Sequence, residues 1–524
     1  MVVKNDFVKS WDNFPKIFSK EYLTSPKEVD NVGIKPIGAG EMSYRPVVTA
    51  TYFLDYFFWK LNPFGFHLTN ILLHAMNVLL FYAFACRIFK DRRKSFWAAL
   101  LFAWHPIHTE AVCNIAFRED LLAFFFYISA LILWERKNTF ILVSLFYLLA
   151  LFSKEMAITF PLVVMIYDYF FVFHQDVKKL FAQRKQRYSW LLASTVFYLW
   201  IWGVVFPSQG ERLIFKDQTA LMNFFTMSKI FAIYVFWCLF PVGIHATIPD
   251  YFIAEYSLSL KVLASLVLLG SIIFYAFKAR RHQPLYSFCV LWFFISLLPV
   301  SNIIPIQFIF ACRYLYIPLA GFCLLFASLI NLKNKFIIGG LMGLLVVYGC
   351  VTYTRQTVWK NGDTFLKELA IYYPYDAWIY KGLGRTYAMK GLIAQAVPYY
   401  EKAKSLSGDD LDVYEELGKL YLQEDKLKQA GQMFSYVAKK DPRRKDARLN
   451  SCGILGAEGQ GSEAIKCFKN MTEDFSGDPA AFYNLGMAYF KEGNILEARQ
   501  MWKKALEIDP NYLYAKEWLA RTQE

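Results

Sequence analysis

Two patterns of apolar and polar positions divide this chain near Tyr353. Before that residue, long apolar and aromatic stretches alternate with short charged loops. Because a helix needs about 20 apolar residues to cross a bilayer, these stretches predict transmembrane helices. The predicted spans are 66–89, 119–134, 139–153, 156–173, 189–206, 260–277, 285–300, 309–331 and 336–354, with 96–112 shorter and weaker.

After Tyr353 the chain becomes polar, and Gly, Tyr, Ala, aromatic and Pro landmarks recur every 34 residues from starts at 377, 411, 445 and 479. This is the period of the tetratricopeptide (TPR) repeat, a pair of antiparallel helices. The third copy is irregular, since Cys452 and Leu455 replace the usual Gly and Tyr, and Ser476 replaces the Pro. Glycine lets two helices approach closely, so we expect the third repeat to be the least stable.

Together the two patterns predict an all-α protein, in which a polytopic transmembrane helix bundle precedes a TPR α-solenoid. We expect an N-terminal loop with an interfacial helix over 1–65, a multi-span membrane domain over 66–354 and a connecting half-repeat over 355–376. Residues 377–524 should form four TPRs and a C-terminal capping helix, which would bind a protein or peptide partner.

Composition agrees with a membrane protein. Apolar residues make up 56% of the chain, and the 50 Phe and 34 Tyr fit aromatic belts at membrane interfaces. The net charge of +14 lies largely in short loops between apolar stretches, which indicates membrane topology and no nucleic-acid partner. The nine Cys are scattered, without a CxxC or a Cys/His cluster, and therefore predict neither zinc nor a disulfide framework.

The basic loops predict the orientation of the spans, because Lys and Arg are retained on the cytoplasmic side. These loops are Lys90/Arg92/Arg93/Lys94, Arg136/Lys137, Lys178/Lys179/Arg184/Lys185/Arg187, Lys278/Arg280/Arg281 and Lys333/Lys335. With all of them in the cytoplasm, both the N-terminal 65 residues and the TPR array lie outside it. The stretch 221–243 breaks the alternation, so it is either re-entrant or interfacial, or the count of spans is off by one.

Charged and polar groups that topology does not explain fall on the extracytoplasmic side. They are Glu41/Arg45, His105/His108/Glu110, Arg118/Glu119/Asp120, Lys154/Glu155 and Arg313. Ionisable groups gathered at one membrane boundary indicate a shared site, although each group could instead end a helix in water. We expect Arg118 and Asp120 at the mouth of the bundle, where water can solvate them.

Two polar motifs lie close to these charges. His67, Asn70, His74 and Asn77 share one helix face, which indicates either interhelical hydrogen bonds or the wall of a polar cavity. The run Trp104-His-Pro-Ile-His-Thr-Glu110 predicts a proline-broken turn. Its His-x-x-His-x-Glu spacing differs from the HExxH arrangement of zinc proteases, so we expect no metal.

The residue types of this site suit transfer from a phosphate carrier. An acid with a neighbouring base can take a hydroxyl proton, and Arg or Lys can neutralise a leaving phosphate. We therefore predict Glu110, Asp120 and Arg118 as catalytic residues. The predicted substrate- and phosphate-binding residues are Arg45, Lys154, Arg313, His105, His108 and His74.

Read as strings, these motifs resemble the transmembrane and TPR repeat-containing (TMTC) family and its bacterial relatives. The matching strings are Tyr44-Arg-Pro, Asn62-Pro-Phe-Gly-Phe-His-Leu-x-Asn70, His74-Ala, His105-Pro-Ile-His-Thr-Glu-Ala-Val112, Arg118-x-Asp-Leu-Leu122, Ser153-Lys-Glu155 and Arg313-Tyr-Leu-Tyr-Ile-Pro318. The resemblance implies a GT-C-type glycosyltransferase related to the protein O-mannosyltransferases. It implies a polyprenyl-phosphate-linked sugar as donor, with mannose transferred to Ser/Thr hydroxyls, no further cofactor, and extracytoplasmic TPRs that engage acceptor or partner proteins.

The sequence departs from the family pattern at two places. Family members begin with one more span and an acidic pair, which would precede Met1, so we expect a start codon further upstream. Cys312 stands where the family usually has an acid. Two other functions stay open, a catalytically inactive membrane-anchored TPR scaffold and a transporter. The resemblance places the protein in the bacterial inner membrane, or in the endoplasmic reticulum of a eukaryote.

Overall fold

A computed structural model describes residues 6–18, 44–205, 219–244, 257–304, 306 and 309–522. The chain divides into two compact units, Met1–Lys360 and Asn361–Glu524. The described residues form helices and no strands, which confirms the all-α prediction. Of the predicted N-terminal loop, residues 1–5 and 19–43 lie outside the described part.

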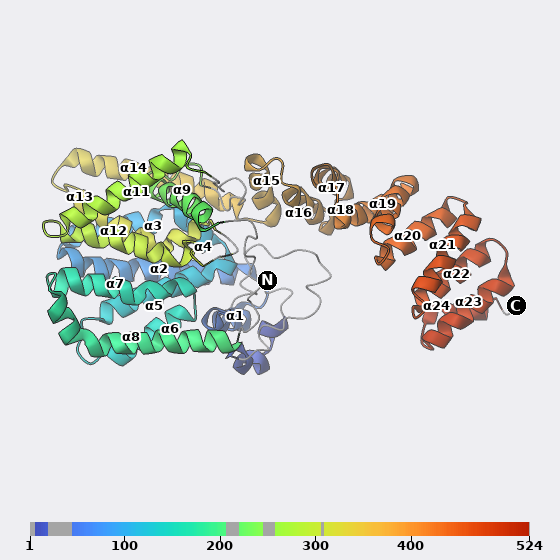
Figure 1. Ribbon diagram of the computed structural model, residues 1–524, viewed down its shortest axis with the longest axis horizontal. Helices are drawn as coiled ribbons and strands as arrows, with labels where there is room; N and C mark the ends of the chain where they lie inside the picture. Colours follow the sequence, from blue (N-terminus) through green and yellow to red (C-terminus); the bar gives the residue numbers. More distant parts are fainter. Residues whose placement is uncertain are drawn as a thin grey trace. The chain divides into compact units, whose positions relative to one another are not determined.

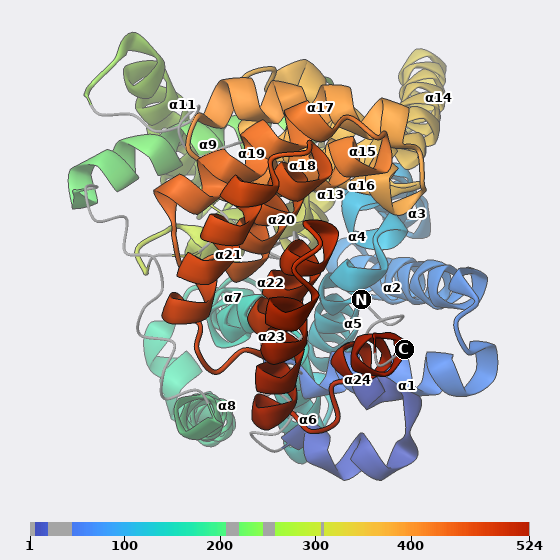
Figure 2. The same ribbon diagram turned by 90° about the vertical axis from the view of Figure 1, so that its right-hand side faces the viewer.

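Six helices of the first unit's described residues are long and apolar enough to cross a membrane. Figures 1 and 2 show them packed, at different angles, in one helical bundle. The six are α2 (Pro63–Phe89), Glu155–Val172 with α7 (Phe160–Tyr167) at its centre, α9 (Ala220–Leu239), α11 (Leu260–Ala279), Cys312–Leu329 with α13 (Tyr316–Leu329), and α14 (Lys335–Val358). The stretch that broke the predicted alternation, 221–243, thus contains a continuous helix and is a further candidate span.

The remaining α-helices complete the first unit. Three predicted spans, 119–134, 139–153 and 285–300, contain helices of 16, 12 and 14 residues, below the length of a full crossing. These are α5 (Arg118–Leu133), α6 (Phe140–Leu151) and α12 (Pro284–Leu297). The others are α1 (Pro46–Trp59), α3 (Arg92–Trp104), α4 (Thr109–Cys113) and α8 (Val177–Val205), which continues the predicted span 189–206 into the basic segment before it.

The predicted proline-broken turn is confirmed. Helix α3 ends at Trp104, a 3₁₀ turn covers Pro106–His108, and α4 follows from Thr109. Proline fits the first position of this turn, where the backbone lacks an acceptor for an N–H in any case. The break redirects the chain, so Glu110 lies on a short helix of its own.

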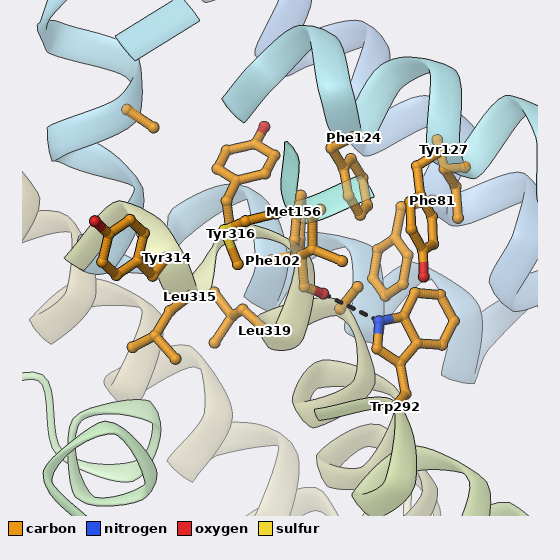
Figure 3. Close-up of a cluster of buried hydrophobic side chains, with 14 of the residues drawn as sticks. Phe81, Phe102, Phe124, Tyr127, Met156, Trp292, Tyr314, Leu315, Tyr316 and Leu319 are labelled. Carbon is orange, nitrogen blue, oxygen red and sulfur yellow. Dashed lines mark hydrogen bonds between the residues drawn. The ribbon is translucent and has the colours of Figure 1, made fainter. Parts of the chain in front are cut away.

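An aromatic core holds the helices of the first unit together (Figure 3). Phe102 of α3 stacks on Phe124 of α5, with ring centroids 5.2 Å apart, and Tyr316 of α13 meets the edge of both rings. The indole of Trp292 in α12 donates a hydrogen bond of 3.2 Å to the carbonyl of Ile317. These contacts fix the start of α13 against α3 and α5, whose ends carry the charged residues.

The second unit is an array of helix pairs, shown from α15 to α24 in Figure 1. After α15 (Gly362–Tyr372) come α16 (Ala377–Met389) and α17 (Ile393–Ser407), α18 (Leu411–Gln423) and α19 (Leu427–Lys440), α20 (Lys445–Ala457) and α21 (Gly461–Asp474), and α22 (Pro479–Lys491) and α23 (Ile495–Ile508), followed by α24 (Leu513–Arg521). The first helix of each pair begins at a repeat start that the sequence predicts.

The landmark glycines mark close contacts between the two helices of a pair. A Cβ atom on Gly418 or Gly486 would lie 2.8 or 2.4 Å from the ring of Phe434 or Trp502, closer than carbon atoms can pack. In the third pair the same position is Cys452, which forms a disulfide with Cys467 of α21. The prediction of no disulfide is therefore wrong. The two cysteines do not have the spacing of a known disulfide motif in the sequence. They are 15 positions apart, and the helical hairpin brings them together.

Candidate active site

The centre of the candidate site is a buried ion pair between Asp120 and Lys154. Asp120 lies in the first turn of α5, and Lys154 directly precedes the 3₁₀ turn Glu155–Thr159. The Lys154 ammonium lies 2.6 Å from each carboxylate oxygen of Asp120, and both side chains are 2% exposed. Burial lowers the pKa of Lys154 to about 8, although the negative charge of Asp120 opposes the shift.

Two further carboxylates connect this pair to Arg45 and to solvent. Glu119 pairs with Arg45 and lies 3.4 Å from the Lys154 ammonium. Arg45 also donates 3.0 Å hydrogen bonds to both oxygens of Glu155, whose side chain is 57% exposed. The network therefore runs from an exposed carboxylate at Glu155 inward to the enclosed Asp120. It holds three carboxylates and two cations, a net negative charge.

A second ion pair, between Glu110 and Arg313, lies beside this network. The Arg313 guanidinium is 2.5 Å from one Glu110 oxygen, and the Arg313 backbone N–H donates to the other at 2.9 Å. The ring of Tyr314 joins the two groups of charges, because Lys154 lies 5.4 Å and Arg313 5.2 Å from its centroid. The structure thus brings five predicted residues, Arg45, Glu110, Asp120, Lys154 and Arg313, into one region.

Arg118 faces a different set of groups. Its guanidinium donates to the side chains of Asn70 at 2.7 Å and Thr51 at 3.0 Å, to the Phe66 carbonyl at 3.0 Å, and pairs with Asp55 at 2.5 Å. Arg118 is fully buried and Asp120 is 2% exposed, so the expectation that water solvates both is wrong. The reason is that α1 and α2 contact α5 and enclose its first turn.

The three predicted histidines take part in packing. His74 bonds to the Tyr316 hydroxyl at 2.7 Å and the Ala103 carbonyl at 3.2 Å, and His105 bonds to the Cys238 carbonyl at 3.2 Å. His108 lies between the rings of Phe102 and Tyr316, at 4.4 Å from each. Asn70 and Asn77 also bond to neighbouring segments, so interhelical hydrogen bonding is confirmed for three of the four residues on that helix face.

Three further acids lie in this region that were not predicted as catalytic or binding residues, although Glu119 and Glu155 belong to the charged groups expected on this side. Glu119 and Glu155 join Arg45 to Lys154, and Asp55 neutralises Arg118. Asp55 is the single charged residue in the apolar helix α1, and this signal could have identified it, because a charge in such a segment needs a partner. Among the described residues, no group of three or more His, Cys, Asp or Glu could hold a metal ion.

Known proteins are similar to this chain in its repeat array and over most of its length. Residues 479–512 match the tetratricopeptide repeat family. A Protein O-mannosyl-transferase of Caenorhabditis elegans is 29% identical over 77% of this chain and 58% of its own length. Protein O-mannosyl-transferase TMTC3 of Mus musculus is 24% identical over 90% of this chain and 57% of its own. Among solved structures, YrrB, a TPR protein with an unusual peptide-binding site, has a TM-score of 0.28 and 24% identity over 36% of this chain and 92% of its own.

The chain spans somewhat more than half the length of the curated relatives it matches. The similarity extends over 77–90% of this chain. The resemblance to the TMTC protein O-mannosyl-transferases is therefore confirmed over most of this chain.

Proposed function

We propose that this protein is a membrane glycosyltransferase that transfers a sugar, mannose in the relatives' names, from a polyprenyl-phosphate carrier to Ser/Thr hydroxyls of proteins. The similarity to protein O-mannosyl-transferases over 77–90% of the chain carries the proposal. Five charged side chains near one end of a GT-C-like bundle support it, because an anionic leaving group needs cations close at hand.

In this proposal, the donor phosphate competes with the carboxylates for Lys154 and Arg45. Both oxygens of Asp120 accept from Lys154 in the structure, so Asp120 cannot accept a proton until the ammonium turns to another anion. Phosphate binding provides that anion. The freed Asp120 carboxylate then acts as general base, while Arg45 and Lys154 neutralise the phosphate.

The transfer step conserves charge and atoms. The acceptor oxygen bonds to the anomeric carbon of the sugar, and the bond from that carbon to the phosphate oxygen breaks. The electron pair leaves with the polyprenyl phosphate, and the hydroxyl proton passes to Asp120. Glu110 is the alternative base, but its carboxylate is held by both the side chain and the backbone of Arg313. Arg118, buried among protein partners, holds the first turn of α5 in place.

We place the TPR array outside the cytoplasm, where it engages the acceptor or a partner protein. The alternation of basic loops motivates this placement. The Cys452–Cys467 bond is an independent reason, because disulfides form and persist in oxidising compartments. Proteolysis of right-side-out and inverted vesicles tests the orientation. Digestion of the array from the cytoplasmic face alone would refute it.

A labelled polyprenyl-phosphate mannose, incubated with membranes containing this chain and a Ser/Thr peptide panel, tests the activity. We expect label on the peptides, and none with membranes that contain Asp120→Asn. The runner-up function is a membrane-anchored TPR scaffold, favoured by the pairing of every buried acid in the site with a cation. Equal labelling with and without the chain would favour the scaffold.

A further inference from the structure

A pocket with a cationic and an apolar wall lies away from the candidate active site. It has a volume of about 380 Å³ and is formed by the start of α3 and the connection from α13 to α14. Its lining residues are Arg92, Arg93, Phe96, Trp97, Leu332 and Ile338. A hydrogen bond of 3.3 Å from Lys94 to the Ser328 carbonyl connects the start of α3 to the end of α13 beside the pocket.

The cationic wall has no anion of its own. Neither the Arg92 nor the Arg93 guanidinium forms a hydrogen bond or ion pair with any other described residue. The nearest carboxylate in sequence, Asp91, accepts from the backbone N–H groups of Arg93 and Lys94 and so caps α3. Three more lysines, Lys90, Lys333 and Lys335, flank these segments in sequence. Several cations against one occupied carboxylate favour an anionic ligand.

The apolar wall indicates what kind of anion. Phe96 is 53% exposed beside the two arginines, and Ile338 belongs to the first turn of α14. Helices Cys312–Leu329 and Lys335–Val358 are both candidate spans, and the pocket lies where one ends and the other begins. With both helices across the bilayer, as their length and composition predict, that position is a membrane–water boundary. A ligand there can place a charged group in water and an apolar chain against Phe96 and Ile338.

We propose that this pocket binds an anionic phospholipid. The headgroup phosphate lies between Arg92 and Arg93, and one acyl chain lies along Phe96, Trp97 and Ile338. Basic pockets beside transmembrane helices suit such headgroups, since guanidinium groups bind phosphate oxygens in pairs. Free phosphate would use the arginines but would leave the exposed ring of Phe96 in water.

Lipid binding to the purified full-length chain tests the proposal. Native mass spectrometry would follow the chain with phosphatidylglycerol, with phosphatidylcholine and with soluble glycerol phosphate. The variant Arg92→Gln/Arg93→Gln removes the cationic wall, and Phe96→Ala shortens the apolar one. The control, Lys178→Gln/Lys179→Gln, removes two exposed lysines of α8 from another basic loop and makes the same change in net charge.

We expect phosphatidylglycerol to bind in preference to phosphatidylcholine. Loss of both arginines should weaken binding roughly 30-fold, and the lysine control should change it less than about twofold. Phe96→Ala should weaken binding of the lipid and leave that of glycerol phosphate unchanged. Three results would overturn the proposal: equal binding of the two lipids, equal losses in the arginine and lysine variants, or glycerol phosphate binding as tightly as the lipid.

Discussion

Ion pairs occur in both units of this protein, and they differ in how far water reaches them. In the array, Lys381 lies 2.9 Å from Asp410 and 3.1 Å from Asp412, with side chains 21–42% exposed. In the membrane unit, Lys154 lies 2.6 Å from Asp120, and each side chain is 2% exposed. The distances in the two ion pairs are similar, but their exposure to water differs, and so does the expected effect of breaking each pair.

An exposed ion pair contributes little to the stability of the fold, because water solvates either charge when its partner is lost. A buried pair costs desolvation energy that its attraction barely offsets, and a well-packed apolar pair would often be as stable. Stability alone thus does not explain why Asp120 and Lys154 are buried together. A site that binds an anion and accepts a proton does explain it, because charges shielded from water interact strongly with a newly bound charge.

The largest expected effect comes from breaking the buried pair. Asp120→Asn should lower transfer by about a hundredfold or more. It should also destabilise the protein by up to about 3–5 kcal/mol, because the buried Lys154 then keeps only its longer, 3.4 Å contact with Glu119. The double variant Asp120→Asn/Lys154→Met removes both charges and should recover most of the stability but none of the transfer. Thermal unfolding in detergent and the labelled-mannose assay measure the two effects separately.

A matched control is Asp168, which follows α7 and contacts Trp134 just after the end of α5. Asp168 is also a buried carboxylate, bonded to Trp134 at 3.0 Å and Tyr188 at 2.8 Å and paired with Arg184 at 3.4 Å. Asp168→Asn should lower stability and leave the transfer rate of the folded protein near that of the wild type. Wild-type transfer by the Asp120/Lys154 double variant would make that pair structural and would move the role of base to Glu110.

The two units also differ in how much the sequence predicted. In the array, interactions repeat at a fixed separation, so the starts of all four repeats and their glycine contacts could be predicted. In the membrane unit, helix positions followed from apolar length, but Arg45 meets Glu155 across 110 residues, and no periodicity connects them. The one-sided distribution of charges and the family strings both indicated the charged residues, and only the structure paired them. The burial of Arg118 also depends on α1 and α2, which the sequence did not place over α5.

Reducing the disulfide should have the next largest effect, within the array. Position 452 is the glycine position of the other repeats, where a side chain cannot fit beside the aromatic ring, so the Cys452–Cys467 bond replaces that close contact. A crosslink closing a loop of this length stabilises by about 3 kcal/mol. Hydrogen exchange on the full-length chain should therefore show a loss of protection over 445–474 when reductant is added.

The neighbouring repeats serve as internal controls for this experiment. Protection over 411–440 and 479–508 should stay nearly constant, because each repeat contacts only its neighbours. Cys467→Ser should show the low protection without reductant and should not respond to it. Unchanged exchange over 445–474 on reduction would mean that packing alone holds the third repeat. Equal protection over 445–474 and 479–508 would separately refute the prediction that the third repeat is the least stable.

The pH dependence of transfer should show whether the Lys154 charge is used. The ammonium is positive below its pKa, which burial lowers to about 8, and it becomes neutral as the pH rises through that value. If Lys154 neutralises the phosphate, transfer should fall about tenfold between pH 7 and 9. Lys154→Arg should retain activity on the alkaline side, since guanidinium stays charged. If transfer by the wild type and by Lys154→Arg falls equally at alkaline pH, the decline belongs to a titrating group other than Lys154.

The smallest expected effect returns to the exposed pair in the array. Lys381→Gln should change the stability of the array by about 0–1 kcal/mol, because Asp410 and Asp412 stay hydrated and Asp412 keeps Arg444 at 2.7 Å. Hydrogen exchange over 377–423 measures the change, and added salt should reduce it further. Transfer to the acceptor peptides should not change. A loss as large as that of Asp120→Asn would show that burial does not set the difference between the two units. It would instead assign Lys381 to the surface that engages the acceptor.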